Sequence, residues 1–159
     1  MKNLKSFKNW KKRGFNSPSP EFIKHQILIN NNLEDSIWIE TGTYYGETTK
    51  LLSRISNKTV TIEADEFLHR NTKERMRSYK NVQFLNGKSE DLLLSTIQSN
   101  LNFKNICFYL DAHLCNDHLR SKSTYGREDN ATPLKLELTI IEKFLNKFEK
   151  IKILIDDIR

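Results

Sequence analysis

Short apolar runs alternate with longer amphipathic stretches along most of this chain. The runs are rich in β-branched and aromatic residues, which predicts strands at residues 37–39, 59–62, 82–85, 106–110 and 151–155. Apolar positions at helical spacing predict helices at residues 21–30, 47–55, 66–79, 89–101 and 133–148. Strands that alternate with helices favour a mainly parallel sheet with helices on both faces. We therefore expect an α/β fold, a three-layer sandwich around a five-stranded sheet.

The first thirteen residues differ from the rest of the chain in charge. The 159 residues carry a net charge of +6, from 26 basic and 20 acidic residues. Six basic residues and no acidic residue lie within residues 1–13, so the remainder holds 20 of each sign. Leu4, Phe7 and Trp10 recur every third residue and favour a short amphipathic helix. Its apolar stripe either packs on the domain or helps the lysines to bind an anionic partner, lipid or nucleic acid.

A proline-rich break separates this basic segment from the alternating pattern. Pro18 and Pro20 forbid helix and favour an extended link. We therefore expect a basic segment and linker over residues 1–20 and one domain over residues 21–159. Hydrophobic residues make up 37% of the chain and charged residues 29%, which is typical of an ordered globular domain.

Cysteine usage and hydropathy bear on the compartment. The two cysteines, Cys107 and Cys115, are too few for a disulfide framework and lack zinc-binding spacing. No apolar run approaches the roughly 18 residues that span a bilayer, and the start of the chain lacks the apolar core of a signal peptide. These features favour a reducing, cytoplasmic setting.

A Rossmann-like sheet of this kind binds ligands beyond the carboxyl ends of its strands. The first predicted strand runs into the turn E-T-G-T-Y-Y-G, from Glu40 to Gly46, in which Gly42 allows a sharp turn and a close ligand approach. Dinucleotide enzymes use G-x-G-x-x-G, but Tyr44 stands at the middle glycine position, so the turn suits a ligand with a ribose and no phosphate. Glu63 ends the second strand, where its carboxylate can accept hydrogen bonds from ribose hydroxyls.

With these features the chain resembles the class I S-adenosylmethionine-dependent methyltransferases over roughly residues 36–159. The segments that carry the resemblance are residues 38–49, 61–65 and 81–90. It implies that the first turn holds the methionine part of the cofactor, the acid after the second strand holds the ribose, and the third segment borders adenine. The cofactor-binding residues that it implies are Glu40, Gly42, Thr43, Gly46, Glu63, Ser89 and Glu90. The family often has an acid at the position of Lys88, so this chain departs from the family pattern in the segment that borders adenine.

Carboxylates and a histidine follow the last two predicted strands. Asp111 and His113 stand where the resemblance places catalytic residues. Together with Asp156 and Asp157, Asp111 can bind a hard divalent cation such as magnesium, which would orient an acceptor hydroxyl. His113 can instead act as a general base. The acids can equally cap loops or pair with nearby arginines, and the irregular residues 114–131 are expected to form a lid.

We therefore expect an S-adenosylmethionine-dependent methyltransferase that acts on an oxygen of a small or sugar-like acceptor, with or without the assistance of a metal ion. Two alternatives stay open, a non-catalytic or degenerate Rossmann-like binding domain and a nicotinamide-dependent enzyme, although the glycine spacing argues against the latter. The sequence ends just after the last predicted strand, which would make this strand a sheet edge. This predicts a shortened sequence, a homodimer through that strand, or a relative without activity.

Overall fold

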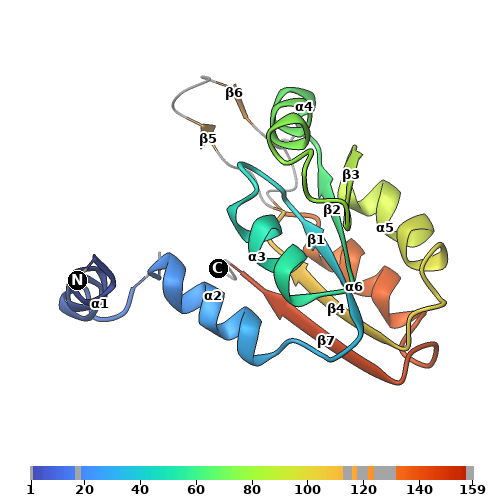
Figure 1. Ribbon diagram of the computed structural model, residues 1–159, viewed down its shortest axis with the longest axis horizontal. Coiled ribbons are helices and arrows are strands. Elements are labelled where there is room, and N and C mark those ends of the chain that lie inside the picture. Colours follow the sequence, from blue (N-terminus) through green and yellow to red (C-terminus); the bar gives the residue numbers. More distant parts are fainter. Residues whose placement is uncertain (1, 17–18, 113–115, 118–121, 124–131, 157–159) are drawn as a thin grey trace.

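The computed structural model describes residues 2–16, 19–112, 116–117, 122–123 and 132–156. Its centre is a five-stranded sheet in the order β3-β2-β1-β4-β7, in which all neighbouring strands are parallel (Figure 1). The strands are Ser36–Thr41 (β1), Lys58–Glu63 (β2), Val82–Asn86 (β3), Asn105–Leu110 (β4) and Lys150–Ile155 (β7). Asn116–Asp117 (β5) and Lys122–Ser123 (β6) form a separate antiparallel pair. The predicted strands are confirmed, and the central sheet is wholly parallel.

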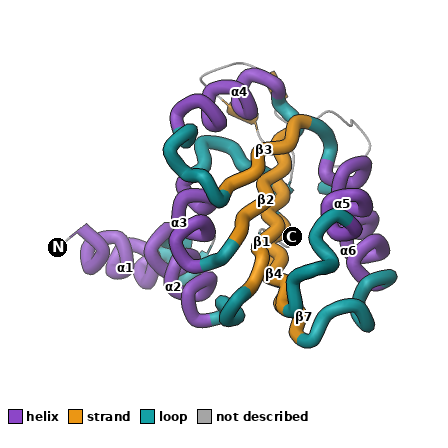
Figure 2. The backbone as a smooth tube through the Cα atoms, turned by 45° about the vertical axis from the view of Figure 1, so that its right-hand side comes forward, coloured by secondary structure: helices purple, strands orange, loops and turns teal. Residues whose placement is uncertain are grey.

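Helices cover both faces of the sheet, which confirms the three-layer prediction (Figure 2). One face carries Glu21–Asn30 (α2), Glu47–Ile55 (α3) and Glu66–Arg75 (α4), and the other carries Ser89–Gln98 (α5) and Leu134–Glu142 (α6). The helices α4, α5 and α6 end three to six residues earlier than the sequence predicts. Each helix is followed by a turn in which a backbone N–H donates to the carbonyl three residues earlier. The N–H of Tyr79, for example, donates to the Met76 carbonyl. Such tight turns keep the apolar spacing of a helix for a few residues beyond its end.

The core consists of two apolar clusters, one on each face of the sheet. Alternate residues of β1 and β4 point to opposite faces, so both strands are buried on both sides, as their unbroken apolar runs require. The cluster beneath α5 and α6 includes Ile37, Ile39, Leu93, Ile97, Ile106, Phe108 and Ile141. The cluster beneath α2 and α3 includes Leu28, Trp38, Leu52, Cys107 and Tyr109.

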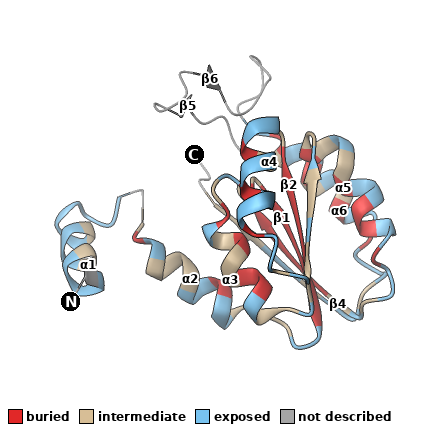
Figure 3. Ribbon diagram, turned by 45° about the horizontal axis from the view of Figure 1, so that its top comes forward, coloured by how far each residue is buried: buried red, intermediate tan, exposed pale blue. Residues whose placement is uncertain are grey.

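The helix Lys2–Lys12 (α1) stands away from the sheet in all three views (Figures 1 to 3). Its apolar stripe packs on a local partner, because the ring of Phe15 lies 5.0 Å from that of Trp10 and 6.3 Å from that of Phe7, between centroids. Leu4, on the same stripe, is 60% exposed. The expected helix is confirmed, but its stripe packs on Phe15, which the positive φ of Gly14 and Phe15 brings back over it, instead of on the sheet.

The last strand lies at one edge of the sheet, as predicted. β7 pairs with β4, and Ile153 of β7 is 37% exposed. A homodimer through this edge stays a prediction. Among the residues that the structure describes, no helix has the length and apolar character needed to cross a membrane.

Candidate functional site

The carboxyl ends of β1 and β4 mark the topological switch point of the sheet, because the chain leaves β1 towards β2 while β4 lies on the other side. Gly42 follows β1 with a φ of +87°, and its N–H donates to the Ile62 carbonyl at 2.9 Å. A Cβ atom at Gly42 would lie 2.7 Å from the carbonyl oxygen of Asp111. The lack of a side chain at Gly42 therefore lets the backbone that follows β4 come close, and the close approach of a ligand to this glycine stays a prediction.

The second glycine of the turn serves helix packing. Gly46 has a φ of +74° and directly precedes α3. A Cβ atom there would lie 2.7 Å from Thr72 Cγ2 and 2.8 Å from Met76 Sδ, so Gly46 lets α4 approach the turn. Tyr44, between the glycines, also has a positive φ of 49°, and its carbonyl accepts a hydrogen bond from the Thr72 hydroxyl at 2.9 Å. The turn is thus fixed from outside by α4.

Glu40 is a fully buried carboxyl group at the end of β1. Its Oε2 accepts hydrogen bonds from the hydroxyls of Thr49 at 2.5 Å and Thr61 at 2.6 Å, and Thr61 also contacts the Thr43 hydroxyl at 2.5 Å. Its Oε1 is buried and has no hydrogen-bond partner within the described ranges. Burial raises the pKa of Glu40 to about 8, although the threonine hydroxyls lower it, and the charges of Asp111 and Glu63 raise it further.

Glu63, at the end of β2, faces the glycine turn. Its Oε2 accepts the N–H of Tyr44 at 2.8 Å and its Oε1 accepts the N–H of Asp65 at 2.9 Å. Burial raises the pKa of Glu63, and these two amide hydrogen bonds oppose that effect. Asp65 caps α4 by accepting the N–H of Leu68 at 2.9 Å, as its position before the helix predicts. The structure therefore brings Glu63 and the turn together.

On the opposite face of the sheet, sequence reasoning missed a buried acid. Ser89 is buried at the start of α5 and Glu90 is half-buried. Beside Ser89 lies Glu137 of α6, only 1% exposed, and burial raises its pKa against the effect of the neighbouring Ser89 and Thr41 hydroxyls. Glu137 Oε1 and both hydroxyl oxygens lack a conventional hydrogen bond among the described residues. Glu137 lies four residues before the buried Ile141, so both side chains lie on the same side of the helix. This position of an acid on the apolar side of a helix was the sequence feature that could have revealed Glu137.

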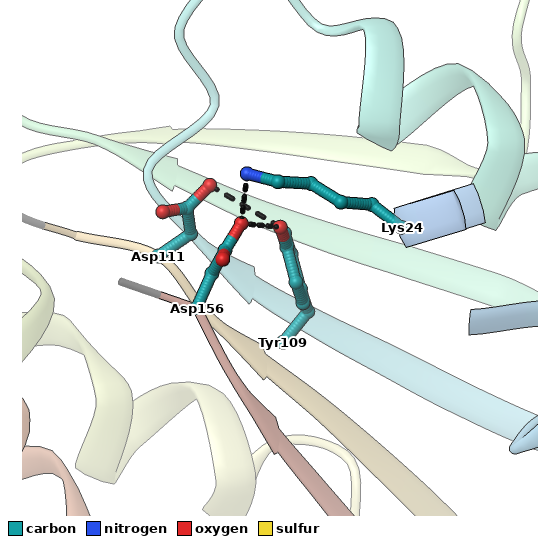
Figure 4. Close-up of polar contacts among 4 residues, drawn as sticks. All are labelled: Lys24, Tyr109, Asp111 and Asp156. Atoms are coloured by element: carbon teal, nitrogen blue, oxygen red, sulfur yellow. Dashed lines mark hydrogen bonds and ion pairs between the residues drawn. The ribbon is translucent and has the colours of Figure 1, made fainter. Parts of the chain in front are cut away.

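A second polar cluster joins the ends of β4 and β7 to α2 (Figure 4). The Tyr109 hydroxyl lies 2.8 Å from Asp156 Oδ2 and 3.3 Å from Asp111 Oδ2, and the ammonium of Lys24 forms an ion pair with Asp156. Burial, with the charges of both carboxylates, raises the pKa of Tyr109, so its hydroxyl stays protonated. The predicted proximity of Asp111 and Asp156 agrees with this arrangement.

Lys24 and Tyr109 were not predicted as site residues. Lys24 lies four residues before the buried Leu28, so it too is a charged residue in register with the buried side of its helix. Tyr109 belongs to an apolar strand and therefore looked like core. Asp156 forms an ion pair with Lys24. The arginines considered as alternative partners of the strand-end acids, Arg120, Arg127 and Arg159, lie outside the described residues. His113, Asp157 and most of the expected lid lie outside the described residues.

The divalent metal ion that the sequence predicts has no support among the described residues. They supply Asp111 and Asp156, two of the three predicted oxygen ligands, and in the described ranges no three histidine, cysteine or acidic side chains gather as a metal site. The ammonium of Lys24 already lies against Asp156, where a cation would need to bind. No chemical step is therefore assigned to a metal.

Sequence comparisons find no matching family model and no matching curated protein. Solved structures do match most of the chain. An rRNA methylase from Streptococcus thermophilus is 18% identical, over 90% of this chain and 75% of its own, with a TM-score of 0.52. A Streptococcus mutans protein named as a methyltransferase and solved with SAH (S-adenosylhomocysteine) is 22% identical, over 83% and 68%, with a TM-score of 0.52.

A third match, a precorrin 8w decarboxylase from Methanobacterium thermoautotrophicum, is 13% identical over 91% of this chain and 66% of its own, with a TM-score of 0.56. At such identities the likeness establishes architecture, and these names differ in the reaction they state. Together with the parallel sheet and its switch point, the matches show that the chain has a Rossmann-like α/β fold, which it shares with these solved methyltransferases.

Proposed function

We propose that this protein is a methyltransferase that uses S-adenosylmethionine and methylates an oxygen of a small or sugar-like acceptor. The observation that carries the proposal is Glu40 Oε1, a buried oxygen without a partner in the described chain, at the switch point beside Glu63. Buried polar atoms are almost always hydrogen-bonded, so such an atom calls for a donor from a ligand or a water. A ligand that carries both a cationic group and a ribose would supply hydrogen-bond donors to Glu40 and to Glu63.

The two strand-end acids would hold different parts of the cofactor. Glu40, whose raised pKa leaves it protonated at neutral pH in the cofactor-free protein, would release that proton so that its Oε1 accepts from the ammonium group of the methionine part. The second lone pairs of the Glu63 oxygens would accept from the ribose hydroxyls. Thr43 supports Glu40 through Thr61. Ser89 and Glu90 would border adenine at the start of α5. The bound cofactor supplies a methyl group made electrophilic by its sulfonium sulfur.

The cluster of Asp111, Asp156, Tyr109 and Lys24 would bind the acceptor (Figure 4). Asp111 would take the proton of the acceptor hydroxyl while that oxygen accepts the methyl group from the sulfonium sulfur of the cofactor. Tyr109 acts as a positioning residue, because its hydroxyl carries one proton, which it can donate to Asp156 Oδ2 at 2.8 Å or to Asp111 Oδ2 at 3.3 Å. Lys24 balances the charge of Asp156. The mixture of carboxylate acceptors with an ammonium and a hydroxyl donor suits a polyhydroxyl acceptor.

Calorimetric titration with SAH tests the cofactor side. We expect the wild-type protein to bind SAH and Glu63→Ala to bind it on the order of tenfold or more weakly, because hydrogen bonds to a charged acceptor are lost. Glu66→Ala, an exposed acid three residues away, is the matched control and should bind as the wild type does. Absence of SAH binding by the wild type, or equal binding by Glu63→Ala, would contradict the proposal. Binding of NADH instead would favour a nicotinamide-dependent enzyme.

Transfer of a labelled methyl group to a panel of sugars and small alcohols tests the chemical step. Asp111→Asn should keep SAH affinity while lowering transfer by about a hundredfold or more, the usual contribution of a general base. Full activity of this variant would remove Asp111 from the proposed role. Labelled protein or RNA with no labelled small product would reject the proposed acceptor class.

A further inference from the structure

The helix α1 combines an apolar stripe with cations on one short element that lies apart from the sheet (Figure 1). Leu4, at one end of the stripe, is 60% exposed, and Phe15, which covers the other end, is 51% exposed. These are among the most exposed large apolar side chains of the described chain. We propose that α1 and Phe15 form a docking element for the surface of an anionic lipid bilayer.

The docking element is already folded before it meets a partner. The rings of Phe7, Trp10 and Phe15 form a cluster, with centroid distances of 5.0 to 6.3 Å, and the Trp10 indole N–H donates to the Asn16 carbonyl at 3.1 Å. The indole nitrogen therefore has a partner, so its ring can enter an apolar region without leaving a donor unbonded. Little further ordering is needed for this surface to bind.

Cations surround the apolar stripe. Lys5, Lys8, Lys11, Lys12 and Arg13 are all exposed, and residues 2–13 contain no acidic side chain. The rest of the chain has equal numbers of basic and acidic residues, so the positive charge is concentrated on this element. Each cation near an anionic membrane surface strengthens binding by about fivefold. Charge complementarity therefore favours an anionic partner.

The apolar side chains favour lipid over nucleic acid. A basic helix with leucine and aromatic residues on its other side is the pattern of helices that lie in a membrane interface. Leu4 is aliphatic and cannot stack on a base, and the aromatic rings of Phe7 and Trp10 meet edge to face instead of presenting open parallel faces. Nucleic-acid binding without sequence preference relies on such stacking platforms. We therefore assign the surface to lipid and treat RNA as an outcome of the test.

Vesicle sedimentation of the full chain tests this assignment. The neutral probe is a vesicle of phosphatidylcholine alone. The anionic probe also contains about 25% phosphatidylglycerol, which gives a negative surface potential. A charge variant carries Lys5→Gln, Lys8→Gln and Lys12→Gln, and an apolar variant carries Leu4→Asn and Phe15→Asn. The matched control carries Lys143→Gln, Lys147→Gln and Lys150→Gln, which are exposed and lie between α6 and the start of β7, away from α1 (Figure 1).

We expect the wild type to bind the anionic vesicles and not the neutral ones. The charge variant should bind about a hundredfold more weakly and the apolar variant about tenfold more weakly. The control should bind as the wild type does. Absence of binding to anionic vesicles, equal losses in the control and charge variants, or an unaffected apolar variant would each overturn the assignment. So would tighter binding to a structured RNA than to the vesicles at equal phosphate concentration.

Discussion

Replacing Glu40 by glutamine tests the buried carboxyl group at the switch point through the pH dependence of stability. Burial raises the pKa of Glu40 from 4.5 to about 8 in the folded protein. Between these values the folded state holds a proton that the unfolded state has released. The free energy of unfolding of the wild type therefore falls as pH rises through this window, by about 1.4 kcal/mol per pH unit from this group alone.

The glutamine variant removes this titration with little change in shape. Its amide oxygen can still accept hydrogen bonds from the Thr49 and Thr61 hydroxyls, which the wild-type Oε2 accepts. Its free energy of unfolding, relative to the wild type, should therefore increase with pH from 5 to 8, by an amount on the order of 3 kcal/mol across the window. Glu63 and Glu137, whose pKa values are also raised, are present in both proteins, so the difference isolates Glu40.

Urea denaturation followed by far-ultraviolet circular dichroism, repeated at half-unit steps of pH, measures this difference. Glu47→Gln is the matched control, because Glu47 is an exposed acid on the first turn of α3. A difference between Glu40→Gln and the wild type that stays constant from pH 5 to pH 8 would refute the reasoning. The difference between Glu47→Gln and the wild type should stay constant across this range, because Glu47 is exposed.

Two further predictions concern the backbone of the turn and the ion pair of the second cluster. Gly42→Ala should lower the free energy of unfolding by about 3 kcal/mol or more, and Gly46→Ala by less, because the obstacle at Gly42 is a backbone carbonyl whereas at Gly46 it includes the movable side chain of Met76. Equal losses in urea denaturation would contradict this. Lys24→Met should lower it by about 1 kcal/mol by removing the Lys24 ammonium from half-buried Asp156, and Lys24→Arg should restore most of that loss. An unchanged Lys24→Met variant would show that the pair contributes nothing to stability.

Most of the fold follows from the hydrophobic pattern because the sheet is buried on both sides. β1 and β4 lie at its centre, and their side chains are covered alternately by two helical layers, which produces unbroken apolar runs that are easy to recognise. Helix ends were less predictable. Residues such as Tyr79 and Phe144 continue the apolar spacing through turns after the last helical residue, and pattern alone cannot separate a turn from one more helical step.

The candidate site divides in the same way. Glu40, Glu63 and Asp111 were predictable because they end strands, and every parallel strand delivers its carboxyl end to one edge of the sheet. Lys24 and Glu137 come from helices, where a charged residue is ordinarily exposed. Only the packing of α2 and α6 on the sheet shows that these two side chains face inwards. Long-range pairing of this kind cannot be read from spacing along one helix.

The two amide hydrogen bonds that Glu63 accepts have a consequence for affinity. They hold the carboxylate in one orientation, so the loss of side-chain rotamer freedom, up to about 2 kcal/mol for a glutamate, is already included in folding. A ligand that bonds to Glu63 does not incur that entropic loss a second time. Because one of the two donors is the N–H of Tyr44, the turn and the acid form one preorganised receptor, and a substitution that loosens either weakens both.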